Sequence, residues 1–147
     1  MSTLERAIAI AAAAHAGVAD KGGQPYILHP LRVMLAVEST EERIAAVLHD
    51  VIEDTPWTLD QLHQEGFSSV VLQALDALTK RDDEDYLTFV RRAGSHPVAR
   101  VVKLADLADN MDLSRLPAPT ARDHERLRKY QAAVALLAAN PIEEGKA

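Results

Sequence analysis

The sequence predicts an all-α protein. Apolar residues recur at helical spacing along the chain, and no alternating run of the β type exceeds this pattern. Capping residues and proline or glycine breaks separate the apolar segments. With 147 residues, of which 48% are hydrophobic, the chain can bury one core. We therefore expect a single domain over residues 1–139 and a frayed tail over residues 140–147.

Each expected helix begins at a capping residue or stops at a break. The first expected helix runs from Ser2 or Thr3 to about residue 18, and the next four cover residues 26–37, 41–53, 58–64 and 68–79. After a charged linker at 80–85, a sixth helix runs to about residue 93. A long seventh helix covers 97 to about 115, and the last covers 120–139. Thr40 and Thr120 are the expected caps of the third and last helices. Pro30 is tolerated because it lies in a first turn, whereas Pro56 ends a helix.

Composition limits the partners that the protein can have. A formal charge of −6 disfavours a nucleic-acid backbone, and it means that an anionic substrate must meet a local basic patch or a metal. The chain has no cysteine, so thiol chemistry is excluded. No apolar run reaches the roughly 18 residues of a membrane span, so we expect no membrane partner and a cytoplasmic location. The sequence leaves the oligomeric state open.

An apolar helical run ends in a cluster of ionisable residues: His49, Asp50, Glu53 and Asp54. If one helix carries them, the pairs at spacing i, i+4 lie on two adjacent faces near the core. Burying carboxylates without a partner is costly, and a divalent metal supplies both charge and fixed ligand directions. The alternative is a helix end with an incidental histidine, although acidic residues there oppose the helix dipole.

Two other segments offer further ligands. His29 lies on the opening turn of an apolar helix, after the loop that contains Gly22 and Gly23. Asp106 lies in the middle of a helix among apolar residues, with Lys103 and Asn110 on the adjoining face. Taken alone, His29 could be a hydrogen-bonded core histidine and Asp106 the border of an amphipathic helix. Beside the first cluster, both favour a metal site.

Three strings together carry a family resemblance: Pro-Tyr-Ile-Leu-His-Pro at 25–30, Leu-His-Asp-Val-Ile-Glu-Asp-Thr at 48–55 and Lys-Leu-Ala-Asp at 103–106. The chain resembles the HD-domain metal-dependent phosphohydrolases. Among them it is similar to the hydrolase domain of the RelA/SpoT alarmone enzymes and to small stand-alone alarmone hydrolases. The resemblance implies a helical bundle of about seven to eight helices around a metal site.

The resemblance also implies roles for single residues. Four of them correspond to the ligands of one manganese ion: His29, His49, Asp50 and Asp106. Glu53 and Asp54 match the acidic pair that activates the attacking water. Lys21 matches a basic residue at the substrate mouth, and Asn110 a residue near ribose and phosphate.

Three positions depart from the family pattern on the substrate side. Asp20 stands where the family carries an arginine that packs on the purine base, so Asp20 is expected to alter base recognition. Leu107 and Asp109 stand where an arginine and a histidine are usual. The basic residues Arg126 and Lys129 are interpreted as part of a solvated helix face.

The expected activity is metal-dependent hydrolysis of a phosphate ester in a small nucleotide. The resemblance favours a 3′-pyrophosphohydrolase acting on (p)ppGpp or a related purine alarmone. One alternative is a nucleotide phosphomonoesterase of the HD superfamily. Another is a catalytically inactive binding module that retains the HD fold.

Overall fold

Side-chain caps fix where most of the helices begin. In the computed structural model, which describes residues 1–142, capping boxes open three helices, at Ser39, Thr58 and Thr120. The elements are α1 (Leu4–Ala14), α2 (Leu28–Leu35), α3 (Thr40–Leu48), α4 (Val51–Asp54), α5 (Leu59–Gln64), α6 (Ser69–Ala77), α7 (Tyr86–Gly94), α8 (Pro97–Asn110), the 3-10 turn η1 (Leu113–Arg115) and α9 (Ala121–Ala139). The all-α prediction is confirmed, and residues 1–142 contain no β-strand.

Several predicted helix ends were wrong, each for a local reason. The first helix stops at Ala14 and not near residue 18, because Gly17 adopts a φ of 82° that a helix cannot continue. The second helix is shorter than 26–37 at both ends. Ser39, not Thr40, caps the third helix, because its hydroxyl accepts the Glu42 amide while the Glu42 side chain returns to the Ser39 amide.

The largest difference lies at His49 and Asp50, where the predicted helix 41–53 is interrupted. The His49 amide bonds three residues back to Ala46, and the regular ladder resumes only with the bond from the Asp54 amide to the Asp50 carbonyl. Nine α-helices therefore appear among residues 1–142. The predicted i, i+4 pairing of His49 with Glu53 and of Asp50 with Asp54 on one continuous helix was wrong, since α3 ends at Leu48 and α4 starts at Val51.

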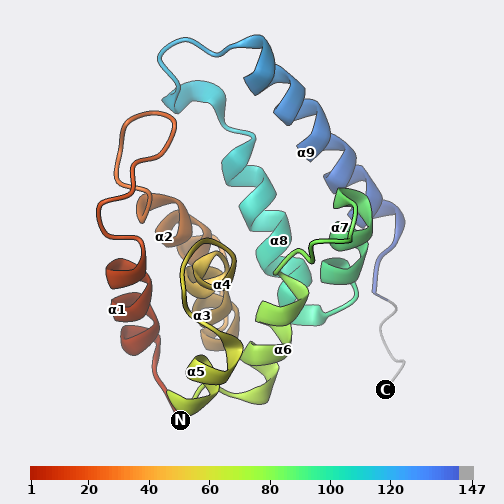
Figure 1. Ribbon diagram of the computed structural model, residues 1–147. Coiled ribbons are helices and arrows are strands. Elements are labelled where there is room, and N and C mark those ends of the chain that lie inside the picture. Colours follow the sequence, from red (N-terminus) through yellow and green to blue (C-terminus); the bar gives the residue numbers. More distant parts are fainter. Residues whose placement is uncertain (143–147) are drawn as a thin grey trace.

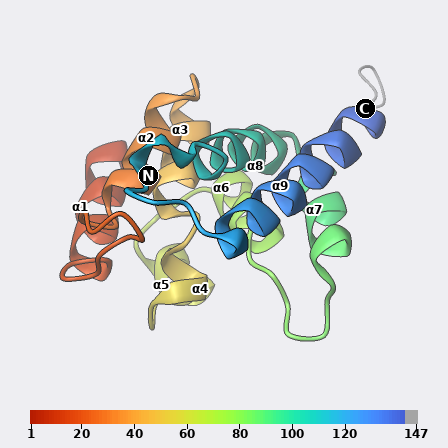
Figure 2. The same cartoon turned by 90° about the horizontal axis from the view of Figure 1, so that it is seen from above.

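Helices α3 and α8 form the centre of the molecule. Helix α3 packs against α1, α2, α6 and α8, and α8 packs against α2, α3, α6, α7 and α9. Figures 1 and 2 show α8 between the group formed by α1, α2 and α3 and the pair α7 and α9. The larger apolar cluster joins residues of all the helices from α1 to α8, and a smaller one joins α7, α8 and α9. Helix α8 contributes Val102 to the first and Leu107 to the second.

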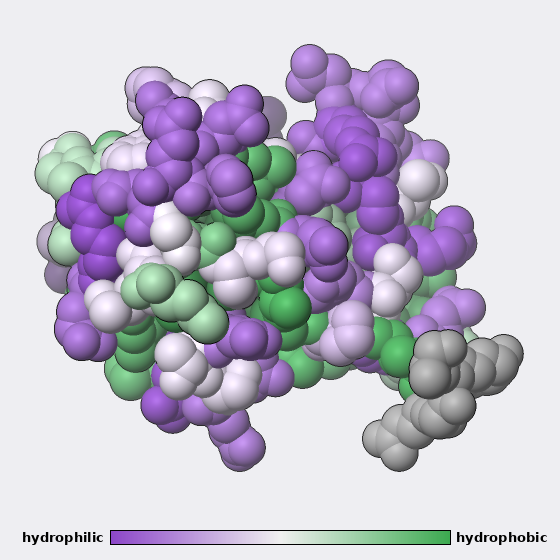
Figure 3. Space-filling view, turned by 90° about the horizontal axis from the view of Figure 1, so that it is seen from below, coloured by the Kyte–Doolittle hydropathy of each residue, from purple (hydrophilic) through white to green (hydrophobic). Residues whose placement is uncertain are grey.

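The surface mixes polar and apolar residues. On the face seen from below, hydrophobic side chains show in the middle among hydrophilic ones (Figure 3). Within residues 1–142, no helix combines the length and the apolar character needed to cross a bilayer. Residues 143–147, most of the predicted frayed tail, lie outside the described part of the chain. Asn140, where that tail was expected to begin, caps α9 and accepts a hydrogen bond from Arg100.

Arg92 joins the charged linker 80–85 to the C-terminal end of α6 by hydrogen bonds. Its guanidinium makes two hydrogen bonds of 2.8 Å to the Glu84 carboxylate. It also donates to the Asp76 carbonyl at 2.9 Å and to the Thr79 carbonyl at 2.8 Å, both at the C-terminal end of α6. The guanidinium thereby satisfies carbonyls that the helix end leaves free. It also lowers the pKa of Glu84 to about 2.

We expect Arg92→Ala to lower the free energy of unfolding by about 1–3 kcal/mol, because several charge-assisted hydrogen bonds disappear together. Arg91→Ala, an exposed neighbour on α7, is the matched control and should change little. The folded-state pKa of Glu84 is depressed, so its contribution is present above pH 4.5 and is lost as the pH falls towards 2. Urea titrations at neutral and acid pH measure this, and a difference between the variants that stays constant over that range would contradict the pairing.

Candidate metal centre

Three helices bring the candidate ligands together. His29 lies in the first turn of α2, His49 directly follows α3, and Asp106 lies in the last third of α8. All three are buried, with at most 6% of each residue exposed. One ligand atom from each of the three lies within 4.8 Å of the others. His29 and His49 are 20 positions apart in the sequence, and His49 and Asp106 are 57 apart. The packing of α2, α3 and α8 brings all three together.

The donor atoms are spaced as a coordinated ion requires. His29 Nε2 lies 2.9 Å from Asp106 Oδ1, and His49 Nε2 lies 3.3 Å from the same oxygen. Ligand atoms about 2.1 Å from an ion stand roughly 3.0–3.4 Å apart in octahedral or tetrahedral sites. Imidazole nitrogens mixed with carboxylate oxygens suit a divalent ion of the first transition row. The residues therefore fit a metal.

Both histidines present the same nitrogen to the site. His49 Nδ1 donates to the Ala46 carbonyl at 2.6 Å, because the chain leaves the helix at this point. His29 Nδ1 lies 2.6 Å from Asp109 Oδ2, so a proton between them belongs to Nδ1. With Nδ1 engaged on each ring, the lone pair of Nε2 is left for a metal.

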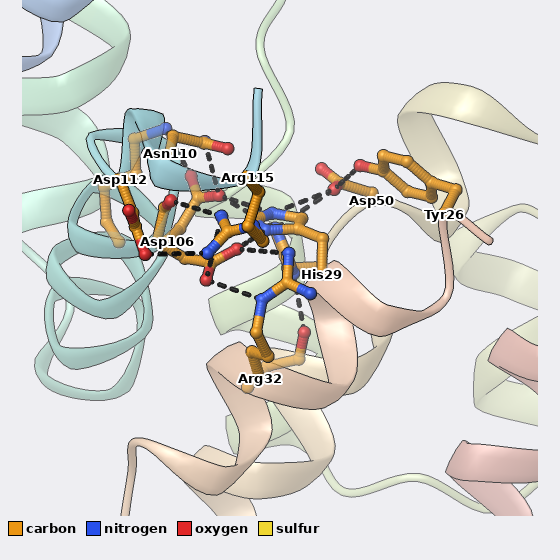
Figure 4. A network of polar contacts seen from close by, with 12 residues as sticks. Tyr26, His29, Arg32, Asp50, Asp106, Asn110, Asp112 and Arg115 are labelled. Carbon is orange, nitrogen blue, oxygen red and sulfur yellow. Dashed lines mark hydrogen bonds and ion pairs between the residues drawn. The ribbon is translucent and has the colours of Figure 1, made fainter. Parts of the chain in front are cut away.

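Asp50 approaches the same point from the other side. Its Oδ2 lies 3.1 Å from His49 Nε2 and 3.8 Å from His29 Nε2. The Tyr26 hydroxyl donates to this oxygen, and burial together with the Asp50 charge raises the pKa of Tyr26. Figure 4 shows Tyr26 and Asp50 facing His29 from the side opposite Asp106. Asp50 does not belong to the tight group of His29, His49 and Asp106, and it lies at the edge of that group.

Asp106 is held ionised by its surroundings. Lys103 Nζ donates to Oδ2 at 3.1 Å, and the Asn110 amide donates to Oδ1 at 3.1 Å. Burial acts to raise the pKa of Asp106. The charges of Lys103 and His49 lower this pKa by more, so it lies well below its usual range. The predicted face shared by Lys103, Asp106 and Asn110 is therefore confirmed.

Glu53 and Asp54 lie on the short helix α4 at the wall of the same cavity. Both residues are more exposed than the candidate ligands. Partial burial, followed by the charge of Asp50, raises the pKa of each carboxyl. Two carboxylates with raised pKa values beside a metal-ligand cluster are candidates for proton transfer.

The cavity that contains this cluster is also lined by basic residues. It has a volume of about 750 Å³. Its cationic lining residues include Lys21, Lys80, Arg115, Arg126 and Lys129. Arg126 and Lys129, which were interpreted as part of a solvated helix face, thus border the cavity, with Lys129 exposed and Arg126 partly buried. Their spacing with Tyr130, at i, i+3 and i+4, was the available signal, since it puts all three on one side of α9.

Asp20 and Lys21 also line the cavity, in the loop between α1 and α2. Asp20 Oδ1 accepts hydrogen bonds from the amides of Gly22 and Gln24, both at 2.9 Å. One of the two carboxylate oxygens of Asp20 thus shapes its own loop. This use of Asp20 was not predicted from the sequence.

Comparison with known proteins agrees with this arrangement. The sequence matches the family described as HD domain over residues 7–135. The chain belongs to the HD-domain family. This membership implies a divalent metal, and His29, His49 and Asp106 are its possible ligands.

Curated relatives share the domain within much longer chains. A probable GTP pyrophosphokinase of Mycobacterium leprae is 33% identical over 81% of this chain and 17% of its own length. A guanosine-3′,5′-bis(diphosphate) 3′-pyrophosphohydrolase of Haemophilus influenzae is 41% identical over 54% of this chain and 12% of its own length. The enzyme of the same name from Aquifex aeolicus is 32% identical over 74% and 17%. The chain thus spans less than a fifth of each of these relatives.

A solved structure shows the same fold. It is described as a metazoan ortholog of SpoT that hydrolyzes ppGpp. The TM-score is 0.80 at 20% sequence identity, and the match covers 96% of this chain and 88% of the other. The expected HD-domain helical bundle is therefore confirmed.

We expect Asp106→Ala to abolish metal binding, because it removes the oxygen that both imidazoles face and leaves Lys103 without its buried partner. Asp76→Ala removes the same charge from an exposed position on α6 and serves as the control. The metal content of both variants is measured after gel filtration by inductively coupled plasma mass spectrometry. Full metal content in folded Asp106→Ala would refute the assignment.

Proposed function

We propose that this domain is a manganese-dependent hydrolase that removes pyrophosphate from the 3′ position of (p)ppGpp or a related purine nucleotide. The observation that carries the proposal is one cavity lined by a His/Asp metal cluster, by the carboxylates of Glu53 and Asp54, and by several cationic residues. Two of the relatives bear the name of this activity. Such a substrate would place the enzyme in the cytoplasm.

The charge distribution supports a substrate with two separate phosphate groups. The protein carries a formal charge of −6, so its overall charge repels a polyanion. The cationic residues that line the cavity offset this repulsion locally. A nucleotide with pyrophosphates on both the 3′ and 5′ oxygens can place one group at the metal cluster and the other beside these cations. A simple monophosphate would engage fewer of these cationic residues.

His29, His49, Asp50 and Asp106 would hold the ion, and a mixed set of imidazoles and carboxylates suits manganese. When bound, a divalent ion polarises a phosphate oxygen and lowers the pKa of a coordinated water. Tyr26 orients Asp50 through its hydroxyl, and Lys103 and Asn110 orient Asp106. The ligand side chains are thus fixed before substrate arrives.

The reaction consumes one water and yields guanosine 5′-diphosphate and pyrophosphate when the substrate is ppGpp. The water oxygen bonds to phosphorus, the bond from phosphorus to the ribose 3′ oxygen breaks, and that oxygen gains a proton. Glu53 accepts the proton of the attacking water, and Asp54 orients the water beside it. The raised pKa of Glu53 brings this base closer to neutral pH.

Substrate contacts come from the loop after α1 and from α8. Lys21 binds a phosphate at the mouth of the cavity, and Asn110 binds near the ribose. Asp20 contributes to base recognition through the oxygen that its own loop does not use. An acidic side chain can accept hydrogen bonds from the N–H groups of a purine.

The direct test incubates the purified protein and manganese with guanosine and adenosine 3′,5′-bis(diphosphates) and separates the products by chromatography. We expect pyrophosphate and the nucleoside 5′-diphosphate in equal amounts. Orthophosphate release from a nucleoside monophosphate, incubated in parallel, would instead identify a phosphomonoesterase, and bound metal without turnover of either kind of substrate would identify an inactive binding module. Protein stripped with a chelator is the control and should be inactive until manganese is restored.

Glu53→Gln should keep the metal and lose turnover by at least about a hundredfold, because an amide preserves size but cannot accept the proton. Steady-state rates and metal content are measured on the same samples. Glu65→Gln makes the same change at a residue that does not line the cavity and serves as the control. A parallel loss of metal would show that Glu53 is a ligand and not the base.

A further inference from the structure

Asp109 makes a contact that the proposed mechanism does not use. Its Oδ2 lies 2.6 Å from Nδ1 of His29, the ring nitrogen that faces away from the candidate metal position. Asp109 lies on α8 three residues after Asp106, so one turn of this helix contacts both nitrogens of the His29 ring. Only 12% of the Asp109 side chain is exposed.

Two arginines hold Asp109 in this place. Arg32, one turn after His29 on α2, donates through Nε to Oδ1 at 2.7 Å and through Nη2 to Oδ2 at 3.1 Å. Arg115 donates to the Asp109 carbonyl at 2.8 Å and lies 3.4 Å from Oδ1. Figure 4 shows both guanidinium groups beside His29. Because the arginines balance its charge, Asp109 can stay ionised with little exposure.

We propose that Asp109 is a positioning residue that holds His29 in the tautomer and ring orientation needed for metal binding, with Arg32 and Arg115 holding Asp109 in turn. A carboxylate at Nδ1 keeps the proton there, directs the Nε2 lone pair to the ion, and makes the imidazole a stronger ligand. The inference rests on the metal site of the proposed function but not on its substrate.

The same group of residues reaches the mouth of the cavity. A Cβ atom on Gly22 would lie 2.8 Å from the Arg115 carbonyl oxygen, so the loop between α1 and α2 lies directly against this residue. Figure 1 shows that loop beside the turn that follows α8. Contacts therefore run from Gly22 through Arg115 and Asp109 to His29.

The test is calorimetric titration of chelator-stripped protein with Mn²⁺, together with the melting temperature of the metal-free protein. Asp109→Ala should weaken Mn²⁺ binding about 10- to 100-fold, the usual effect of removing the partner of a metal-bound histidine. Asp109→Asn should lose less, since its amide oxygen can still accept from Nδ1. Asp112→Asn is the control, because Asp112 also pairs with Arg115 and does not contact His29.

The outcomes separate the inference from the metal site itself. A purely structural ion pair between α2 and α8 would lower the melting temperature of metal-free Asp109→Ala and leave its Mn²⁺ affinity unchanged, and that result would overturn the inference. If Asp109→Ala does not fold, Asp109→Asn decides in the same way. A natural protein that binds no Mn²⁺ would overturn the metal site and the inference together.

Discussion

The burial of charged groups where α2, α3 and α8 meet is the constraint on which the other features depend. Two imidazoles and a carboxylate are almost fully removed from water at this point. Each is tied to a neighbour: Asp106 to Lys103, His49 to a backbone carbonyl and His29 to Asp109. Such a cluster costs free energy unless its polar atoms are paired, and a bound cation offsets the remaining negative charge.

This constraint explains the local architecture. Helix α3 stops at Leu48, and the non-helical turn that follows lets the next two residues approach the cluster from one helix end. Helix α8 lies between two apolar clusters and carries Asp106 and Asp109 on its remaining side. The candidate ligands are therefore held by helix packing, and the loops around the cavity are free to vary in what they bind.

Local signals in the sequence predicted much of this structure. Thr58 and Thr120 begin their helices as expected, because a cap depends on residues within one turn. The three ligand motifs could be read for the same reason. The interruption of the helix after Leu48 could not be predicted, because the apolar residues around it have the spacing of a continuous helix. The contact of Asp109 with His29 spans 80 residues, and no spacing rule predicts it.

The opposed charges of the cavity have a consequence for encounter with a ligand. The cations and carboxylates that line the cavity create a local electric field at its opening, although the protein as a whole is anionic. This field would orient an approaching polyanion before it touches the surface. Dissolved salt would reduce the orienting effect, because it screens the field over roughly 10 Å. Capture would then depend on ionic strength more steeply than the net charge suggests.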